Sequence, residues 1–233
     1  MHIPDGFING GTSLAAGVVA VGGTAVCLNQ ASKTLDDRQV PMIGLSAAFI
    51  FAAQMLNFPV ASGTSGHLLG GVLAAVLVGP WAGAICVTVV LFVQALLFAD
   101  GGLSALGLNV VNMALVGSFV GYGIFLAIRR LMPAKRSSVV VASGIAAGLA
   151  PVLAAVVFTL EYAIGGSGVA SVGNVAAAMI GVHLLIGIGE GVITAMTISA
   201  VLASRPDLVY GARDIPPTAA PAPAPVVVDG VRS

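Results

Sequence analysis

The chain has 233 residues, of which 58% are hydrophobic and only 8% are charged, and its mean hydropathy is +1.07. About a quarter of the residues of a soluble domain are charged, so this composition excludes a soluble domain and indicates a membrane protein. Nine basic residues balance nine acidic residues, which leaves no basic field to neutralise the phosphates of a nucleic acid.

The chain begins with a candidate metal chelate, MHIPDG at positions 1–6. The α-amine of Met1, the backbone nitrogen of His2 and its imidazole can hold one ion in fused rings, a near-planar set that suits Ni(II), Cu(II) or low-spin Co(II). The alternative is an ordinary disordered N-terminal histidine. We expect Met1 to be retained, because methionine removal requires a small second residue. We also expect no signal cleavage, because the segment has no basic start and the first apolar run is long enough to span a bilayer.

Apolar runs long enough for helices follow one another along the chain, at about 12–31, 41–57, 67–79, 81–99, 106–131, 138–164 and 173–203. A helix needs about 20 residues to cross the hydrocarbon, so the short third run predicts a tilted or partly re-entrant helix buried by its neighbours. The pattern predicts an all-α membrane protein with seven transmembrane helices.

The basic residues divide the loops into two classes. With seven spans, all nine lysines and arginines fall on one side, which the positive-inside rule makes cytoplasmic. The N-terminus is then outside and the C-terminus inside. We therefore predict a multi-pass transmembrane domain over residues 1–205, followed over 206–233 by a Pro/Ala-rich cytoplasmic tail that we expect to be disordered.

The outer side carries two of the three histidines, with acidic and no basic side chains. His67 lies in the glycine-rich stretch SGTSGHLLGG at 62–71, where glycines allow close backbone approach and Ser65 can satisfy local backbone groups. We interpret His67 as a fourth nitrogen ligand that completes the set from Met1 and His2, since an ionisable residue inside a membrane marks a functional site by default. The alternative is a histidine that merely caps the short third helix.

Further polar residues are candidates for support of the site. Asp5 or Asp100 could hydrogen-bond a ligand histidine and hold its tautomer, and Asn57, like Gln94, Asn109 and Asn112, is expected to hydrogen-bond within the core. His183 and Glu190 lie seven residues apart, hence on one helix face, and should point into the bundle. The spacing does not fit a helical two-ligand metal site, so we expect structural hydrogen bonding or support of a ligand there rather than direct ligation.

Small residues recur at four-residue spacing, at Ala16/Ala20, Gly66/Gly70, Gly117/Gly121 and Gly144/Gly148. Such pairs let helices approach closely. They serve either packing within this chain or a face that docks another membrane subunit, and the sequence leaves both open.

Four motifs in order give the chain a family resemblance: MHIPDGF at 1–7, SGTSGHLLGG at 62–71, QALLFADGG at 94–102 and HLLIGIGE at 183–190. Together they resemble the CbiM/NikM family, the substrate-binding (S) components of energy-coupling-factor (ECF) transporters for cobalt and nickel, over about residues 1–205. The resemblance implies a seven-helix S component whose N-terminal segment is tucked into the centre of the bundle. It also implies metal ligation by Met1, His2 and His67.

The resemblance further implies three partners: a transmembrane coupling subunit of the CbiQ type, an ATP-binding cassette ATPase of the CbiO type and a small auxiliary membrane subunit of the CbiN type. The chain has no Gly-x-x-x-x-Gly-Lys-Ser/Thr loop, so ATP hydrolysis should come from another chain. We expect a non-enzymatic protein of the cytoplasmic (inner) membrane with no cofactor, which takes up Co²⁺ as substrate for cobalamin synthesis.

Three alternatives stay open. Ni²⁺ accepts the same nitrogen ligands as Co²⁺. A membrane enzyme could use His183 and Glu190 in acid–base chemistry, although a nucleophile is missing. A passive metal channel would not need a tight chelate.

Overall fold

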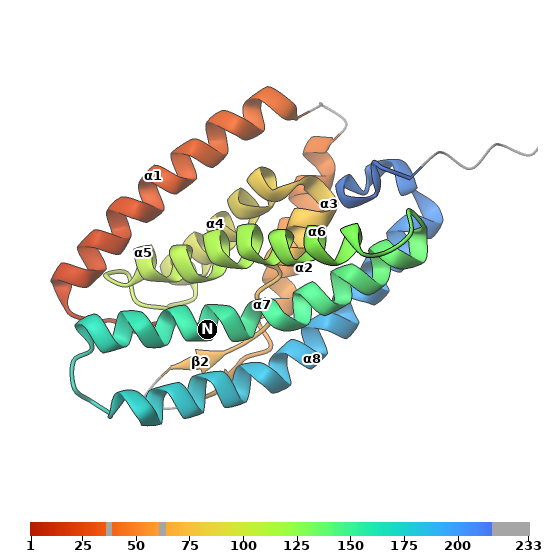
Figure 1. The fold of residues 1–233 in the computed structure, drawn as a ribbon. Helices are drawn as coiled ribbons and strands as arrows, with labels where there is room; N and C mark the ends of the chain where they lie inside the picture. The colour runs from red at the N-terminus through yellow and green to blue at the C-terminus, as the bar shows by residue number, and fades with distance from the viewer. Residues whose placement is uncertain (36–38, 61–63, 216–233) are drawn as a thin grey trace, which may run out of the picture.

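The computed structural model describes residues 1–35, 39–60 and 64–215, which form a helical bundle (Figure 1). The helical elements are α1 (Gly10–Thr34), α2 (Val40–Gln54), α3 (Gly71–Val78), α4 (Pro80–Leu97), α5 (Leu106–Asn109), the π-helical stretch η2 (Val110–Val120), α6 (Gly121–Arg130), α7 (Arg136–Gly165) and α8 (Val172–Ser204). Two short strands, β1 (Phe58–Pro59) and β2 (Ser65–Gly66), pair antiparallel before α3.

Five helical segments are long and apolar enough to cross a membrane: α1, α4, the continuous segment α5–η2–α6, α7 and α8. α2 has 15 residues and α3 has 8, both below the length that a full crossing requires. Each predicted apolar run therefore contains a helix, and the all-α multi-pass architecture is confirmed. Seven complete spans and the side on which each end lies stay predictions.

α3 is buried along its whole length, as the short third run predicted. It is bounded by two glycines with positive φ, Gly70 at +76° and Gly79 at +91°, and Pro80 then begins α4. Such short helices are tolerated at membrane depth only where protein surrounds them. Because α3 is so short, the loop before it reaches the interior of the bundle.

The small-residue pair Gly144/Gly148 serves packing within the chain. α7 and α8 lie side by side (Figure 1), and a Cβ on Gly191 would lie 2.7 Å from the Gly144 carbonyl oxygen, while a Cβ on Gly187 would clash with the Gly148 carbonyl oxygen. Backbone therefore meets backbone across this interface, an approach that only glycine permits. The sequence left open whether such pairs serve packing within the chain or docking of another subunit, and for Gly144/Gly148 the structure shows packing within the chain.

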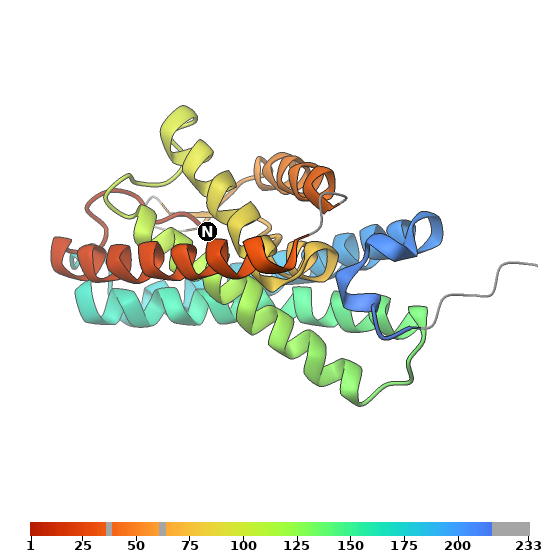
Figure 2. The same ribbon diagram turned by 90° about the horizontal axis from the view of Figure 1, so that it is seen from above.

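The first nine residues form an extended segment that enters the bundle, where the N-terminus is marked in Figures 1 and 2. Met1 and Ile3 are buried. The backbone N–H of Ile3 donates to Asn109 Oδ1 at 2.8 Å, and the Gly102 N–H donates to the Ile3 carbonyl at 2.8 Å. The Asn9 N–H donates to the Gly165 carbonyl at 2.7 Å. The end of α5, the loop after α4 and the end of α7 thus hold the segment in place.

The chain after α8 continues to pack on the bundle as far as residue 215. Two short turns, η3 (Pro206–Leu208) and η4 (Tyr210–Ala212), follow α8, and Val209 is buried. Arg129 at the end of α6 forms an ion pair with Asp214 at 2.5 Å. The packed part therefore extends past the boundary predicted at residue 205. The Pro/Ala segment 216–225 lies outside the described residues.

Candidate metal site

The N-terminal segment and the loop before α3 bring two predicted ligand residues together. His2 forms an antiparallel backbone bridge with Ser65 of β2, and His67 follows two residues later on the same loop. The centroids of the His2 and His67 rings lie 4.6 Å apart. Met1 is 1% exposed, His2 is 4% exposed and His67 is 0% exposed. The candidate site is therefore a buried pair of imidazoles beside a buried α-amine.

The hydrogen bonds of His67 define which ring nitrogen is available. Its Nδ1 lies 2.7 Å from the Leu68 carbonyl oxygen. A carbonyl can only accept, so Nδ1 carries the proton and Nε2 keeps its lone pair. Nε2 is buried and has no hydrogen-bond partner among the described residues. A buried lone pair without a donor calls for an explanation, and this one is free to bind an ion.

Burial also favours the neutral forms that a metal requires. Desolvation holds the pKa of the Met1 α-amine well below its usual value of 8.0. Desolvation, together with the nearby N-terminal amine, lowers the pKa of His2 to about 2. Metal ligation needs deprotonated nitrogen, and both pKa shifts favour that form.

The donor set depends on the α-amine. Among the residues that the structure describes, no group of three His, Cys, Asp or Glu side chains could hold a metal ion. The side chains of His2 and His67 supply two nitrogens, and the predicted tetragonal set of four also requires the Met1 amine and the His2 amide. That set matches the preference of Ni(II) and low-spin Co(II).

A cavity of about 280 Å³ opens beside His2 and contains two carboxylates. Asp100 Oδ2 lies 3.5 Å from His2 Nε2 and accepts a hydrogen bond from Asn57 Nδ2 at 2.9 Å. The residues that line this cavity include Asp5 and Ser65 and no lysine or arginine. A cation in this cavity meets negative charge on its way to the imidazoles.

Of the two carboxylates that could hydrogen-bond a histidine, Asp5 instead binds Ser104. Its Oδ1 accepts from the backbone N–H and the hydroxyl of Ser104, at 2.8 and 2.5 Å. These hydrogen bonds lower the pKa of Asp5 below its ordinary value. Asp5 thereby anchors the N-terminal segment to the loop after α4, and Asp100 is the carboxylate beside His2.

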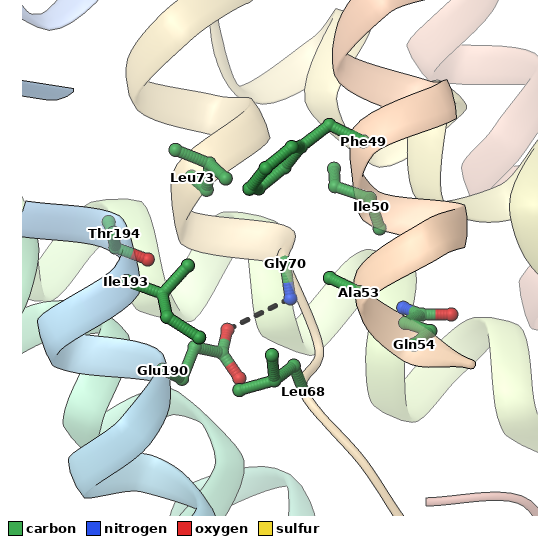
Figure 3. A pocket seen from close by; sticks show the side chains of 10 residues that line it. All are labelled: Phe49, Ile50, Ala53, Gln54, Leu68, Gly70, Leu73, Glu190, Ile193 and Thr194. Carbon is green, nitrogen blue, oxygen red and sulfur yellow. Dashed lines mark hydrogen bonds between the residues drawn. The ribbon is translucent and has the colours of Figure 1, made fainter. Parts of the chain in front are cut away.

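Glu190 holds the loop that carries His67. Its carboxylate oxygens accept from the backbone N–H groups of Leu69 and Gly70, at 2.7 and 2.9 Å, and Figure 3 shows the second of these bonds. Apolar side chains of α2, α3 and α8 surround it. One of these donors, Gly70, is the N-cap of α3, so the carboxylate also lies at the N-terminus of that helix. The structure shows the structural hydrogen bonding expected of Glu190, and support of a metal ligand stays a prediction.

His183 and Gln94 are the remaining buried polar groups nearby. His183 is fully buried, its Nδ1 lies 2.7 Å from the Met179 carbonyl, and its Nε2 has no hydrogen-bond partner among the described residues. A Cβ on Gly66 would lie 3.5 Å from His183 Cε1, so the ring lies against the loop beside His67. The side chain of Gln94 is fully buried and interacts with the His2 imidazole.

The sequence did not single out Gly101 and Ser104 as site residues. A Cβ on Gly101 would lie 2.8 Å from His2 Nδ1, and Ser104 binds Asp5. Both residues follow Asp100 in the sequence. The pair of glycines at 101–102 is the feature of the sequence that could have indicated a close contact there.

Comparisons with known proteins all find similarity to metal transport proteins. A family model, CbiM, described as "Cobalt uptake substrate-specific transmembrane region", matches residues 2–208. The putative fused nickel transport protein NikMN of Archaeoglobus fulgidus is 42% identical over 209 residues, covering 90% of this chain and 68% of that protein. The cobalt transport protein CbiM of Sorangium cellulosum is 35% identical over 217 residues, covering 90% and 94%. A crystal structure of a truncated transition metal transporter matches with a TM-score of 0.77 and 34% identity, covering 87% of this chain and 99% of that one.

Proposed function

Because the chain belongs to the CbiM family of cobalt and nickel transport membrane proteins, we propose that it captures Co²⁺ outside the cell and delivers it to the cytoplasm. In this proposal it is the substrate-binding component of an ATP-driven ECF transporter, and the delivered cobalt supplies cobalamin synthesis. The observation that carries the proposal is the buried site in which His2 and His67 lie 4.6 Å apart next to the Met1 amine.

The ion binds to four nitrogens: the α-amine of Met1, the backbone nitrogen and imidazole of His2, and Nε2 of His67. The geometry supports this set through the unpartnered lone pair of His67 and the low pKa of the amine. Ligation by the His2 backbone nitrogen requires loss of its proton, so binding weakens as the pH falls. Met1 is in this proposal the mature N-terminal residue with a free amine.

The charges of the described residues support the predicted orientation. Asp5 and Asp100 line the cavity beside the site, whereas the described basic side chains lie near the opposite ends of the helices, at the ends of α1, α6 and α8 and the start of α7 (Figures 1 and 2). Arg38 and Arg232 lie outside the described residues. The site then opens to the exterior and the basic end lies in the cytoplasm.

The relatives support an auxiliary partner. The Archaeoglobus protein is named as a fused M and N form, so we propose that an N-type membrane component acts with this chain. A coupling subunit of the CbiQ type and an ATPase of the CbiO type complete the proposed complex, because this chain carries no phosphate-binding loop of its own.

Ni²⁺ is the second candidate substrate. Relatives named for nickel transport and for cobalt transport are both similar to this chain, and Ni²⁺ accepts the same tetragonal nitrogen set with higher intrinsic affinity than Co²⁺. We propose cobalt first, since the family model is described as cobalt uptake.

The test is the metal content of two purified proteins that differ by one residue before Met1. The protein with a free Met1 amine should copurify with one ion or bind it tightly, and the extended protein should lose it, because the amine is replaced by an amide. Elemental analysis then distinguishes cobalt from nickel. Equal metal content in both proteins would refute the amine ligand and move the site toward His67 and His183.

A further inference from the structure

A second cavity lies far from the metal site, between α6 and the segment that follows α8. Its volume is about 400 Å³. Tyr122, Leu126 and Arg130 of α6 line one side, and Tyr210 and Arg213 line the other. None of these residues has a role in the metal site described above.

The walls of this cavity are fixed by specific contacts. Arg129 donates to Asp214 at 2.5 Å and to the Pro133 carbonyl at 3.0 Å, which ties the C-terminal segment to α6. The rings of Tyr122 and Tyr210 lie 6.1 Å apart, edge to face, and the Arg213 guanidinium lies 4.0 Å above the Tyr210 ring. The cavity is therefore a built feature between two packed elements.

The cavity carries an excess of positive charge. Its lining contains three arginines and one aspartate. Asp214 is paired with Arg129, whereas Arg130 and Arg213 form no ion pair with another described residue. Two exposed guanidinium groups therefore face a cavity whose carboxylate is already neutralised, which favours an anionic ligand.

Apolar surface lies next to these charges. Arg130 is the last residue of α6, the end of a segment long enough to cross a membrane. Leu126 lies one turn earlier, deeper in the span, and is 38% exposed. Arginines at the end of a span lie at the level of lipid headgroups, with leucines at the level of the acyl chains.

We propose that this cavity binds the phosphate headgroup of an anionic phospholipid. Arg130 and Arg213 bind the phosphate, the hydroxyls of Tyr122 and Tyr210 are available as further donors, and the acyl chains follow Leu126 along α6. Basic pockets beside membrane helices recognise anionic lipids in this way. The bound lipid would link the end of α6 to the segment after α8.

Native mass spectrometry of the purified full chain tests the proposal, with phosphatidylglycerol and phosphatidylcholine as probes. The wild-type protein should retain one phosphatidylglycerol in preference to phosphatidylcholine. The double variant R130Q/R213Q should bind phosphatidylglycerol about 25-fold more weakly, at about fivefold for each arginine.

The matched control is K33Q/R205Q, which removes two positive charges from residues that do not line the cavity. It should bind phosphatidylglycerol like the wild type. Equal losses in both double variants would overturn the proposal in favour of a general surface charge. Equal retention of phosphatidylglycerol and phosphatidylcholine by the wild type would also overturn the proposal.

Inorganic phosphate distinguishes a lipid from a free anion. Millimolar phosphate should leave phosphatidylglycerol bound, because it lacks the acyl contacts with α6. Displacement of the lipid by phosphate would overturn the lipid assignment. If R130Q/R213Q fails to fold, as a thermal melt would reveal, the lipid preference and the phosphate competition of the wild type still decide the question.

Discussion

Substitution of Gly101 by alanine should damage metal binding through one contact. Gly101 has φ +93°, and an added Cβ would lie 2.8 Å from His2 Nδ1 and 3.0 Å from Asn109 Nδ2. An ordinary contact begins at 3.4 Å, so the imidazole would have to withdraw by about 0.6 Å (3.4 − 2.8). Ligand geometry must be held within about 0.5 Å, so we expect the dissociation constant for Co²⁺ to rise about 10- to 100-fold.

Gly168→Ala is the matched control for the backbone cost. Gly168 has φ +77° and an added Cβ would meet nothing within 4 Å. Both variants place alanine at positive φ, at a cost of about 1–2 kcal/mol in folding free energy, but only one reaches His2. Isothermal titration with Co²⁺ measures binding, and thermal unfolding measures stability. If Gly101→Ala binds Co²⁺ as tightly as Gly168→Ala does, the placement of the His2 imidazole in the metal site is wrong.

Three further predictions concern the support of the site, the helix packing and the entry cavity. Glu190→Gln should weaken Co²⁺ binding about 10- to 100-fold, because an amide can accept only one of the two N–H bonds from the ligand loop. Glu161 lies in α7 and accepts a hydrogen bond from Asn112 Nδ2, away from the loop of His67. Glu161→Gln should therefore leave Co²⁺ binding unchanged. Gly187→Ala should lower the free energy of unfolding by about 1–3 kcal/mol, because its Cβ meets the backbone of α7. Gly189→Ala, which meets nothing within 4 Å, should not lower it. Asp100→Asn should slow metal association about tenfold in stopped-flow measurements, because the cavity loses the charge nearest His2.

Each of these predictions has a contradicting result. Equal Co²⁺ affinity in the two glutamate variants would mean that the loop is held without the carboxylate. Equal melting temperatures of the two glycine variants would mean that α7 and α8 separate easily. An unchanged association rate for Asp100→Asn would mean that the ion enters by another route.

The sequence was sufficient for the features that rest on local chemistry. Apolar runs located the helices, the Gly79–Pro80 step located the break between α3 and α4, and MHIPDG with His67 located the nitrogens that the fold brings together. Long-range partners were out of reach. Glu190 binds Leu69 across 121 residues of sequence, and Asp5 binds Ser104 across 99. No periodicity in the sequence indicates such pairs, which explains why the sequence left open whether Asp5 or Asp100 lies beside His2.

The C-terminal boundary shows a different limit. Composition changes sharply at the prolines from residue 216 on, whereas residues 206–215 are too few to give a periodic signal. Tertiary contacts decide their structure: Tyr210 fills the space beside Gly79, and Asp214 pairs with Arg129. A contact between a turn and a distant helix cannot be read from the turn alone.

The docking of the N-terminal segment sets an order for the assembly of this protein. The N–H of Ile3 bonds to Asn109, 106 residues later, and Asn9 bonds to Gly165 at the end of α7. These partners are synthesised long after the segment itself, so the segment leaves the ribosome early and reaches its final place late. Until α7 is inserted, the hydrogen bonds that position the N-terminal segment and His2 are incomplete. A truncated or misassembled chain therefore presents no complete site. Metal binding by this family member would then report completed folding as well as the presence of the ion.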